Sequence, residues 1–236
     1  MRFFISILFC AALALGAQSE NLDKNTSDFD VEFKETTPIA DPLSGYNRVM
    51  TGFNDAFYEY ALIPVARGYA YVVPKSARTA VSNFFDNLMF PVRFVNNLLQ
   101  FKFKNAGEET LRFLANTIIG FGGLTDGAQY YGLTKRDEDF GQTLGAWGLG
   151  GGFHVVLPVL GPSNARDVVG LVGDAFLNPV NYLDSHWAAF GINAYKYLND
   201  FSHDPNAYDN LKKDAVDLYP FLRDAYEQRR NHLIKE

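Results

Sequence analysis

Residues 41–60 read DPLSGYNRVMTGFNDAFYEY, and this stretch indicates the structural class of the chain. An aromatic or apolar side chain recurs there every three or four positions, at Tyr46, Val49, Phe53, Phe57 and Tyr60. That spacing is typical of one face of an amphipathic α-helix. The preceding Asp41-Pro42 pair predicts an N-cap and a first helical turn, because aspartate accepts free backbone N–H groups and proline is tolerated at the first position.

The same periodicity predicts further helices over residues 75–90, 92–99, 108–119, 165–177, 186–200 and 207–232. A strand is indicated at His154 to Leu157, a short run between Gly150-Gly151-Gly152 and Pro158. We expect this run to form one arm of a short glycine-rich hairpin. The predicted fold class is therefore mostly α, all-α apart from the hairpin.

The N-terminus has the layout of a secretory signal peptide over residues 1–17, with Arg2 before a short apolar stretch and small residues after it. The alternative is an uncleaved N-terminal anchor. Cys10 lies inside the apolar stretch and follows Phe9, so we interpret it as part of the targeting segment and not as a lipid attachment site. Residues 18–40 are polar and acidic and predict a flexible tether, followed by one helical domain over 41–236.

Composition limits the partners. A net charge of -6 argues against a nucleic-acid partner, because no net basic field collects phosphates. Aromatic residues make up 15% of the chain, which suits either a packed core or a lipid interface. No stretch beyond residue 17 has the roughly 18 apolar residues of a spanning helix. Two interpretations follow: the apolar faces pack on one another in a soluble bundle, or they lie in a membrane interface.

Catalytic and metal-binding motifs are absent from the sequence, which contains no G-x-S-x-G elbow, H-E-x-x-H pair or P-loop. The histidines are scattered, and we predict no enzyme activity, no metal site and no cofactor. The run Asp137-Glu138-Asp139 is interpreted as a solvated acidic loop, in preference to a calcium site, because the alternating oxygen ligands of an EF-hand are missing.

Glycine is dense just before the predicted strand, at Gly145, Gly148, Gly150, Gly151 and Gly152. Such density disfavours helix and strand and marks a hinge or a close backbone approach. The functional interpretation is a hinge that lets the hairpin tilt, and the alternative is a static sharp turn.

Several segments, in order, resemble the MlaA/VacJ family. The match runs over residues 41–232, and each piece is weak while the ordered set is specific. The segments are Asp41-Pro42-Leu43-Ser44-Gly45-Tyr46-Asn47-Arg48 with Phe53-Asn54, Glu138-Asp139-Phe140-Gly141-Gln142-Thr143-Leu144-Gly145 with Trp147-Gly148, Leu157-Pro158-x-Leu160-Gly161-Pro162-Ser163, Arg166-Asp167 and Gln228-Arg229-Arg230.

The resemblance implies a ring-like helical protein embedded in the inner, periplasmic leaflet of the Gram-negative outer membrane. It implies an amphipathic channel that removes misplaced phospholipids from the outer leaflet. It further implies transfer to a periplasmic carrier (MlaC-like), delivery to an ATP-driven inner-membrane transporter, and association with a trimeric porin. The matching hinge and pore positions are Gly148, Gly150, Gly151, Gly152, Phe153 and His154.

Arg48 and Arg166 are candidates for contact with the headgroup phosphate, and pairing with Asp41 and Asp167 is the alternative. The chain departs from the family at the lipoprotein cysteine, so the helices themselves are expected to hold it in the leaflet. His154 is a second departure and predicts either a pH-sensitive charge near the hinge or an ordinary polar position. The alternative function is a soluble periplasmic scaffold or lipid-binding module of the same fold without channel activity.

Overall fold

The computed structural model describes residues 39–236. The predicted signal peptide, Cys10 and nearly all of the predicted tether lie outside the described residues, so those predictions stay untested. The first half of the domain contains α3 (Ser44–Phe57), the π-helical turn η1 (Tyr58–Leu62), α4 (Ile63–Val72), α5 (Lys75–Leu88), α6 (Phe90–Leu99) and α7 (Phe103–Ile118). The second half contains the 3-10 turn η2 (Gly127–Tyr131), α8 (Phe140–Ala146), β1 (His154–Leu157), β2 (Gly161–Asn164), α9 (Ala165–Leu177), η3 (Pro179–Tyr182), α10 (His186–Phe201), α11 (Ala207–Asp214) and α12 (Leu218–Lys235).

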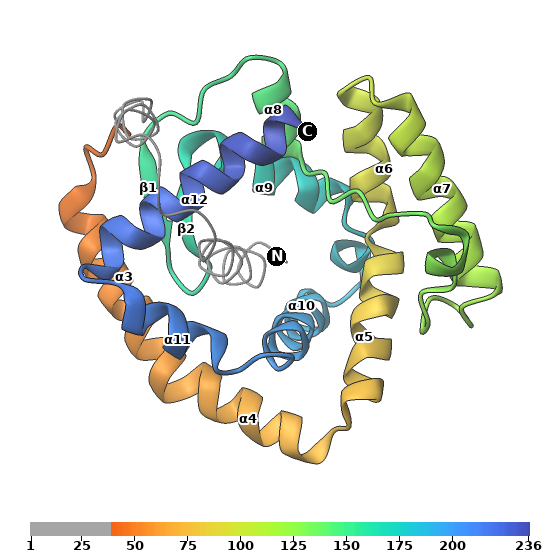
Figure 1. Ribbon diagram of the computed structural model, residues 1–236, viewed down its shortest axis with the longest axis horizontal. Coiled ribbons are helices and arrows are strands. Elements are labelled where there is room, and N and C mark those ends of the chain that lie inside the picture. The colour runs from red at the N-terminus through yellow and green to blue at the C-terminus, as the bar shows by residue number, and fades with distance from the viewer. Residues whose placement is uncertain (1–38) are drawn as a thin grey trace, which may run out of the picture.

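The helices lie around the middle of the molecule as an irregular ring (Figure 1). Helices α3 and α4 form one side, α5 to α7 form the next, and α8 and α12 complete the circuit. Helix α10 stands inside this ring and packs on α4 and α5. The hairpin lies between α3 and α12, because β1 contacts α3 and β2 contacts α12. The mostly helical, ring-like class is confirmed.

The hairpin strands are antiparallel, with His154 opposite Asn164 and Leu157 opposite Gly161. The predicted strand at residues 154–157 is therefore confirmed at both ends. Its partner β2 reads GPSN, a sequence with no strand signal of its own. This second arm is fixed by pairing to β1 and by contact with α12.

Most predicted helices are present, and the range 165–177 is correct at both ends. Two predictions are wrong. The range 207–232 contains two helices, because the chain breaks after Asp214 and Asp217 then caps α12. The Asp41-Pro42 pair does not cap α3, whose N-cap position is Leu43. The Asp41 carboxylate instead accepts hydrogen bonds from Asn47 and Tyr219.

The interior combines one aromatic cluster with an extensive polar network. Tyr58, Leu62, Ile63 and Ala66 pack against Tyr197, Phe201 and Tyr208 of the α10–α11 region. Elsewhere the largest fully buried side chains are polar or charged and include Arg230, His154, Gln142 and Glu109. Burying such groups requires hydrogen-bonded partners, and the helices supply these to one another.

Many apolar faces point away from the interior. On α7, the predicted face Leu111, Leu114 and Ile118 is exposed, Ile118 to 76%. On α3, Val49 and Phe53 are also exposed. The interpretation that these faces pack against one another is therefore wrong for α3 and α7. Among residues 39–236, no helix combines the length and the apolar content that crossing a membrane requires.

Candidate functional site: an amphipathic pocket

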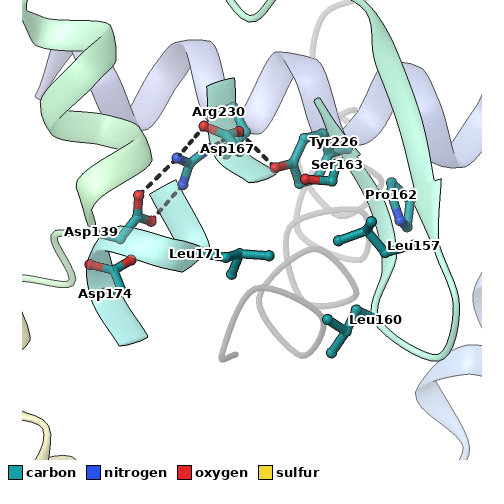
Figure 2. Close-up of a pocket in the computed structure, with 10 residues that line it drawn as sticks. All are labelled: Asp139, Leu157, Leu160, Pro162, Ser163, Asp167, Leu171, Asp174, Tyr226 and Arg230. Carbon is teal, nitrogen blue, oxygen red and sulfur yellow. Dashed lines mark hydrogen bonds and ion pairs between the residues drawn. The ribbon is translucent and has the colours of Figure 1, made fainter. Parts of the chain in front are cut away.

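A pocket of about 110 Å³ lies between the hairpin, α9 and α12, with the start of α8 at one end (Figure 2). Two kinds of wall enclose it. Its lining residues are Asp139, Leu157, Leu160, Pro162, Ser163, Asp167, Leu171, Asp174, Tyr226 and Arg230. Leu157, Leu160 and Pro162 come from the hairpin and face Leu171 of α9, which gives an apolar wall. The charged residues lie together at the opposite end.

Arg230 is the centre of the charged wall and is 1% exposed. Its guanidinium donates to both oxygens of Asp139 (2.7 and 2.9 Å) and to both oxygens of Asp167 (2.7 and 2.8 Å). Tyr226, one helical turn before Arg230, donates its hydroxyl to Asp167 (2.7 Å). A planar guanidinium between two carboxylates satisfies its donors in this geometry, which a lysine could not reproduce.

Helix ends bring the two carboxylates to Arg230. Asp139 is the N-cap of α8 and accepts the backbone N–H of Gln142 (2.8 Å). Asp167 lies in the first turn of α9, just after the Asn164 cap. Gly141 and Gly170 allow α8 and α9 to approach closely, because a Cβ on Gly170 would lie 2.5 Å from the Gly141 nitrogen.

Two carboxyl groups of this wall, Asp139 and Asp174, have pKa values shifted in opposite directions. Burial by itself would raise the pKa of Asp139, but the charge and hydrogen bonds of Arg230 outweigh it, and the pKa is lowered. Asp174 differs, because burial and the negative charge of Asp139 raise its pKa to about 7. Its carboxylate accepts from Asn96 Nδ2 and from the Phe140 backbone N–H, both at 3.0 Å. The pocket thus holds an ionised network next to a carboxyl group that titrates near neutral pH.

The predicted hinge residues do not line this pocket. Gly148 and Gly152 have φ values of +90° and +73°, which favour glycine. The carbonyl of Gly151 accepts the backbone N–H of Arg166 (3.2 Å), and Gly150 has open space beside it. Phe153 is exposed. Residues 149–152 thus have no regular secondary structure and few contacts on their outer side.

His154 is completely buried, and its Nδ1 lies 3.2 Å from a Glu227 carboxylate oxygen. Asn164 donates to the same carboxylate, so Glu227 of α12 connects both strands of the hairpin. The interpretation of residue 154 as an ordinary polar position does not anticipate this contact, because sequence spacing gives no sign that Glu227 lies beside it.

The two arginine candidates have carboxylate partners. Arg166 is buried and donates to Asp167 (2.9 Å), which is the alternative pairing expected for it. Arg48 is exposed and donates to Asp217 (2.8 Å), so its expected pairing with Asp41 is wrong. Asp41 is taken instead by Arg223 (3.3 Å), because α12 packs against α3 at this point. Neither arginine lines the pocket.

The other motif residues have mostly structural positions. Asn47 and Asn54 point from α3 to the hairpin backbone, and Trp147 donates its indole N–H to the Leu99 carbonyl (2.9 Å). The Phe140 ring lies where a Cβ on Gly173 would be. The remaining positions are Pro42 and Pro158 at turns, Gly45 at the start of α3, Phe53 on its outward face, and Gly161, which is buried at the start of β2.

The acidic run Asp137-Glu138-Asp139 is not the solvated loop that the sequence suggests. Glu138 is buried and accepts from Lys102 (2.7 Å) and Gln100 (2.8 Å). Within residues 39–236, no group of histidine, cysteine and acidic side chains is arranged to hold a metal ion. The sequence also gives no indication that Tyr226 and Asp174 line the pocket, because their partners lie on other helices.

Comparisons with known proteins agree with this architecture. The family described as MlaA lipoprotein matches residues 39–233. The intermembrane phospholipid transport system lipoprotein MlaA of Escherichia coli is 35% identical over 203 residues, covering 82% of this chain and 78% of that protein. The protein with the same description from Haemophilus influenzae is 32% identical and covers 83% of this chain and 79% of its own length.

Two further matches cover almost the whole length of the matched protein. An uncharacterized protein of Rickettsia felis is 30% identical over 240 residues, covering 100% of this chain and 95% of its own. A solved structure described as the structural basis for maintenance of bacterial outer membrane lipid asymmetry matches with a TM-score of 0.73. It is 33% identical and covers 83% of this chain and 99% of that chain.

Proposed function

Because this chain belongs to the MlaA lipoprotein family, we propose that it transports phospholipids and maintains the lipid asymmetry of a bacterial outer membrane. In this proposal it accepts phospholipids from the outer leaflet, conducts them along an amphipathic path and releases them on the periplasmic side. The relatives are named for a transport system, which supports a role without catalysis.

The observation that carries the proposal is the pairing of an amphipathic pocket with outward apolar faces. A phospholipid has a charged headgroup and apolar tails, and a path for it needs both kinds of surface. The Arg230 network supplies the charged wall, and Leu157, Leu160 and Leu171 supply the apolar wall. The six predicted hinge and pore residues remain candidates for moving the hairpin that carries part of this wall.

The exposed apolar faces support embedding in one leaflet. Full burial of such a side chain contributes roughly 1.5 to 3 kcal/mol, so Ile118 and Phe121 would gain most of that by moving from water into acyl chains and Leu114, 46% exposed, about half. Helices can lie in a leaflet without crossing it, since their backbone hydrogen bonds are satisfied internally. We place the protein in the inner leaflet, exported by the predicted signal peptide and held by its own helices.

The partners in this proposal are those that the family resemblance implies. They are the phospholipids, a soluble periplasmic carrier that receives them, a trimeric porin beside the ring, and an ATP-driven inner-membrane transporter that acts after the carrier. Arg48 and Arg166 remain proposed headgroup contacts, and each would first have to exchange its present carboxylate for a phosphate.

The test is the outer-leaflet phospholipid content of a strain that lacks the protein, with and without complementation. We expect the deletion to raise that content and the wild-type gene to restore it. Complementation with Leu160→Asp, which places a charge in the apolar wall, is expected to fail although the protein is present in membranes. Normal lipid content in the deletion strain would refute the proposal. Full release by carbonate washing would favour the soluble scaffold instead.

A further inference from the structure

The outer edge of strand β1 faces a helix, not another strand. Its backbone N–H and C=O groups therefore need partners that a helix backbone cannot provide. Two asparagine side chains of α3 provide them. Asn47 donates to the His154 carbonyl (3.1 Å) and accepts the Val156 N–H (2.8 Å).

Asn54 repeats this arrangement at the tip of the hairpin. Its Nδ2 donates to the Leu157 carbonyl (2.8 Å), and its Oδ1 accepts the Val159 N–H (2.7 Å). A primary amide carries a donor and an acceptor side by side, so it can replace the edge of a missing strand. Asn54 lies seven positions after Asn47, which places both amides on the same face of α3.

Val159 has an unfavourable backbone conformation. Its φ is +64°, in the left-handed region that β-branched residues rarely adopt. Its N–H is held by Asn54, and its carbonyl accepts the Tyr58 hydroxyl (2.5 Å). Both polar groups of the strained residue are thus fixed by side chains from one continuous helical segment.

The strained residue lies between two residues of the pocket. Leu157 and Leu160 flank Pro158-Val159 and form part of the apolar wall opposite Arg230. A change in the backbone dihedrals at residue 159 would rotate the peptide that carries Leu160. The position of this wall therefore depends on whether Val159 stays in the left-handed region.

We propose that Asn54 and Tyr58 are positioning residues that hold the hairpin tip and thereby set the apolar wall of the lipid path. The consequence for lipid passage rests on the proposed function, whereas the holding of the tip does not. Without these contacts, Val159 relaxes to negative φ and the wall moves away from the charged side.

Amide hydrogen exchange on the full-length protein in detergent tests the holding step directly. Tyr58→Phe keeps the ring in the aromatic cluster and removes the hydroxyl, so exchange over residues 157–161 rises about tenfold, the effect of losing the hydrogen bond to the Val159 carbonyl. The same hydroxyl also accepts a long hydrogen bond from Tyr197 of α10 (3.5 Å), which this variant loses as well. Asn54→Ala removes two bonds and gives an effect on the order of a hundredfold. Thr51→Ala is the matched control, because that hydroxyl bonds back to its own helix at Asn47. Exchange over 157–161 that is unchanged in both variants overturns the proposal.

Suppression by Val159→Gly separates positioning from general stability. Glycine adopts φ +64° without strain, so the tip keeps its conformation with fewer contacts. In cells, Tyr58→Phe is expected to raise outer-leaflet phospholipid severalfold, and adding Val159→Gly is expected to restore it. A double variant as defective as Tyr58→Phe overturns the positioning role. A deletion strain with normal lipid content would refute the proposed function, and the exchange experiment would still decide whether the tip is held.

Discussion

The junction of α8, α9 and α12 and the outer face of α7 have opposite compositions. At the junction, Arg230 is almost fully buried between two carboxylates. On α7, Leu111 and Ile118 point outward and are exposed. A protein in water normally buries leucine and isoleucine and exposes arginine. Here the helices contact one another through polar networks, and many of their apolar side chains face outward.

The two faces of α7 repeat this contrast within one helix. Its inner face carries Glu109, which accepts from Arg93 (2.7 Å) and from the Arg136 N–H (2.7 Å). Its outer face carries Leu114 and Ile118. Hydrogen-bonded charges fix the geometry between helices more strictly than interchangeable apolar contacts do. The contrast shows that α7 is joined to the ring by polar contacts and turns its apolar side chains outward, the arrangement that the proposed embedding in a leaflet requires.

The largest effect is expected from Arg230→Met, which tests the polar junction. The substitution keeps a long side chain but leaves Asp139 buried without its cation, and Asp167 keeps only Arg166. Breaking a buried ion pair by removing one partner costs about 3 to 5 kcal/mol. Thermal unfolding in detergent should shift downward by roughly 10 °C or more.

Arg67→Met is the matched control, because Arg67 pairs with Asp209 at the surface. Exposed pairs contribute about 0.2 to 1 kcal/mol, so its melting temperature should change little. Equal shifts in the two variants would contradict the structural importance of the buried network.

The second effect concerns Asp174 and depends on pH. Its pKa is raised from 3.8 to about 7, so between these values the folded chain holds a proton that the unfolded chain releases. The free energy of unfolding therefore falls as pH rises through this window. The upper limit of the loss is on the order of 4 kcal/mol, from about 1.4 kcal/mol per pH unit.

Asp174→Asn removes this titration and keeps an oxygen that can accept from Asn96 and Phe140. We expect the variant to be more stable than the wild type above pH 7 and similar to it near pH 4. Chemical unfolding measured at both pH values checks the prediction. The prediction would be contradicted if the free energy of unfolding changed between pH 4 and pH 7 by the same amount in the wild type and in Asp174→Asn.

The sequence predicts the helices well and their contacts poorly. The range 165–177 is correct because Asn164 caps the helix and its apolar side chains recur at helical spacing. The break between α11 and α12 was recognisable from Asp217, a good N-cap three residues before Pro220. The second strand could not be recognised from the sequence, because Gly161 and Pro162 disfavour a strand and the strand forms only by pairing with β1.

The site was predictable in part. Asp139 and Asp167 belong to the motifs of the family resemblance and both line the pocket, but the sequence predicted structural positions for them and a pore at residues 148 and 150–154. Asp174 and Tyr226 carry no local signal, because their surroundings depend on how α9 and α12 pack. The exposed face of α7 shows the same limit: periodicity identifies an apolar face but does not say whether protein or lipid covers it.

A smaller effect on stability, but a clear one on location, is expected from Leu114→Glu combined with Ile118→Glu. Both side chains are exposed, so the polar interior is unaffected. A charged side chain among acyl chains costs about 2.5 to 3.5 kcal/mol, and carbonate-resistant membrane association should fall. Gln228→Glu on α12 adds a charge at an exposed polar position and should remain associated. Undiminished retention of the double variant would mean that this face does not contact lipid.

The smallest effect on stability is expected from Gly150→Pro, which tests the hinge against the static turn. Gly150 is exposed, its φ is not left-handed, and open space surrounds it, so a ring can be added without a clash at Cβ. Proline fixes φ near −65° and restricts the preceding Leu149, which stiffens the approach to the hairpin. If the hairpin tilts during lipid passage, outer-leaflet phospholipid rises in cells while the melting temperature stays within a few degrees.

Gly150→Ala fits the same space with less restriction and should behave as the wild type. Normal lipid content with Gly150→Pro would assign this segment a static role and leave the tip contacts of Asn54 and Tyr58 to set the hairpin position.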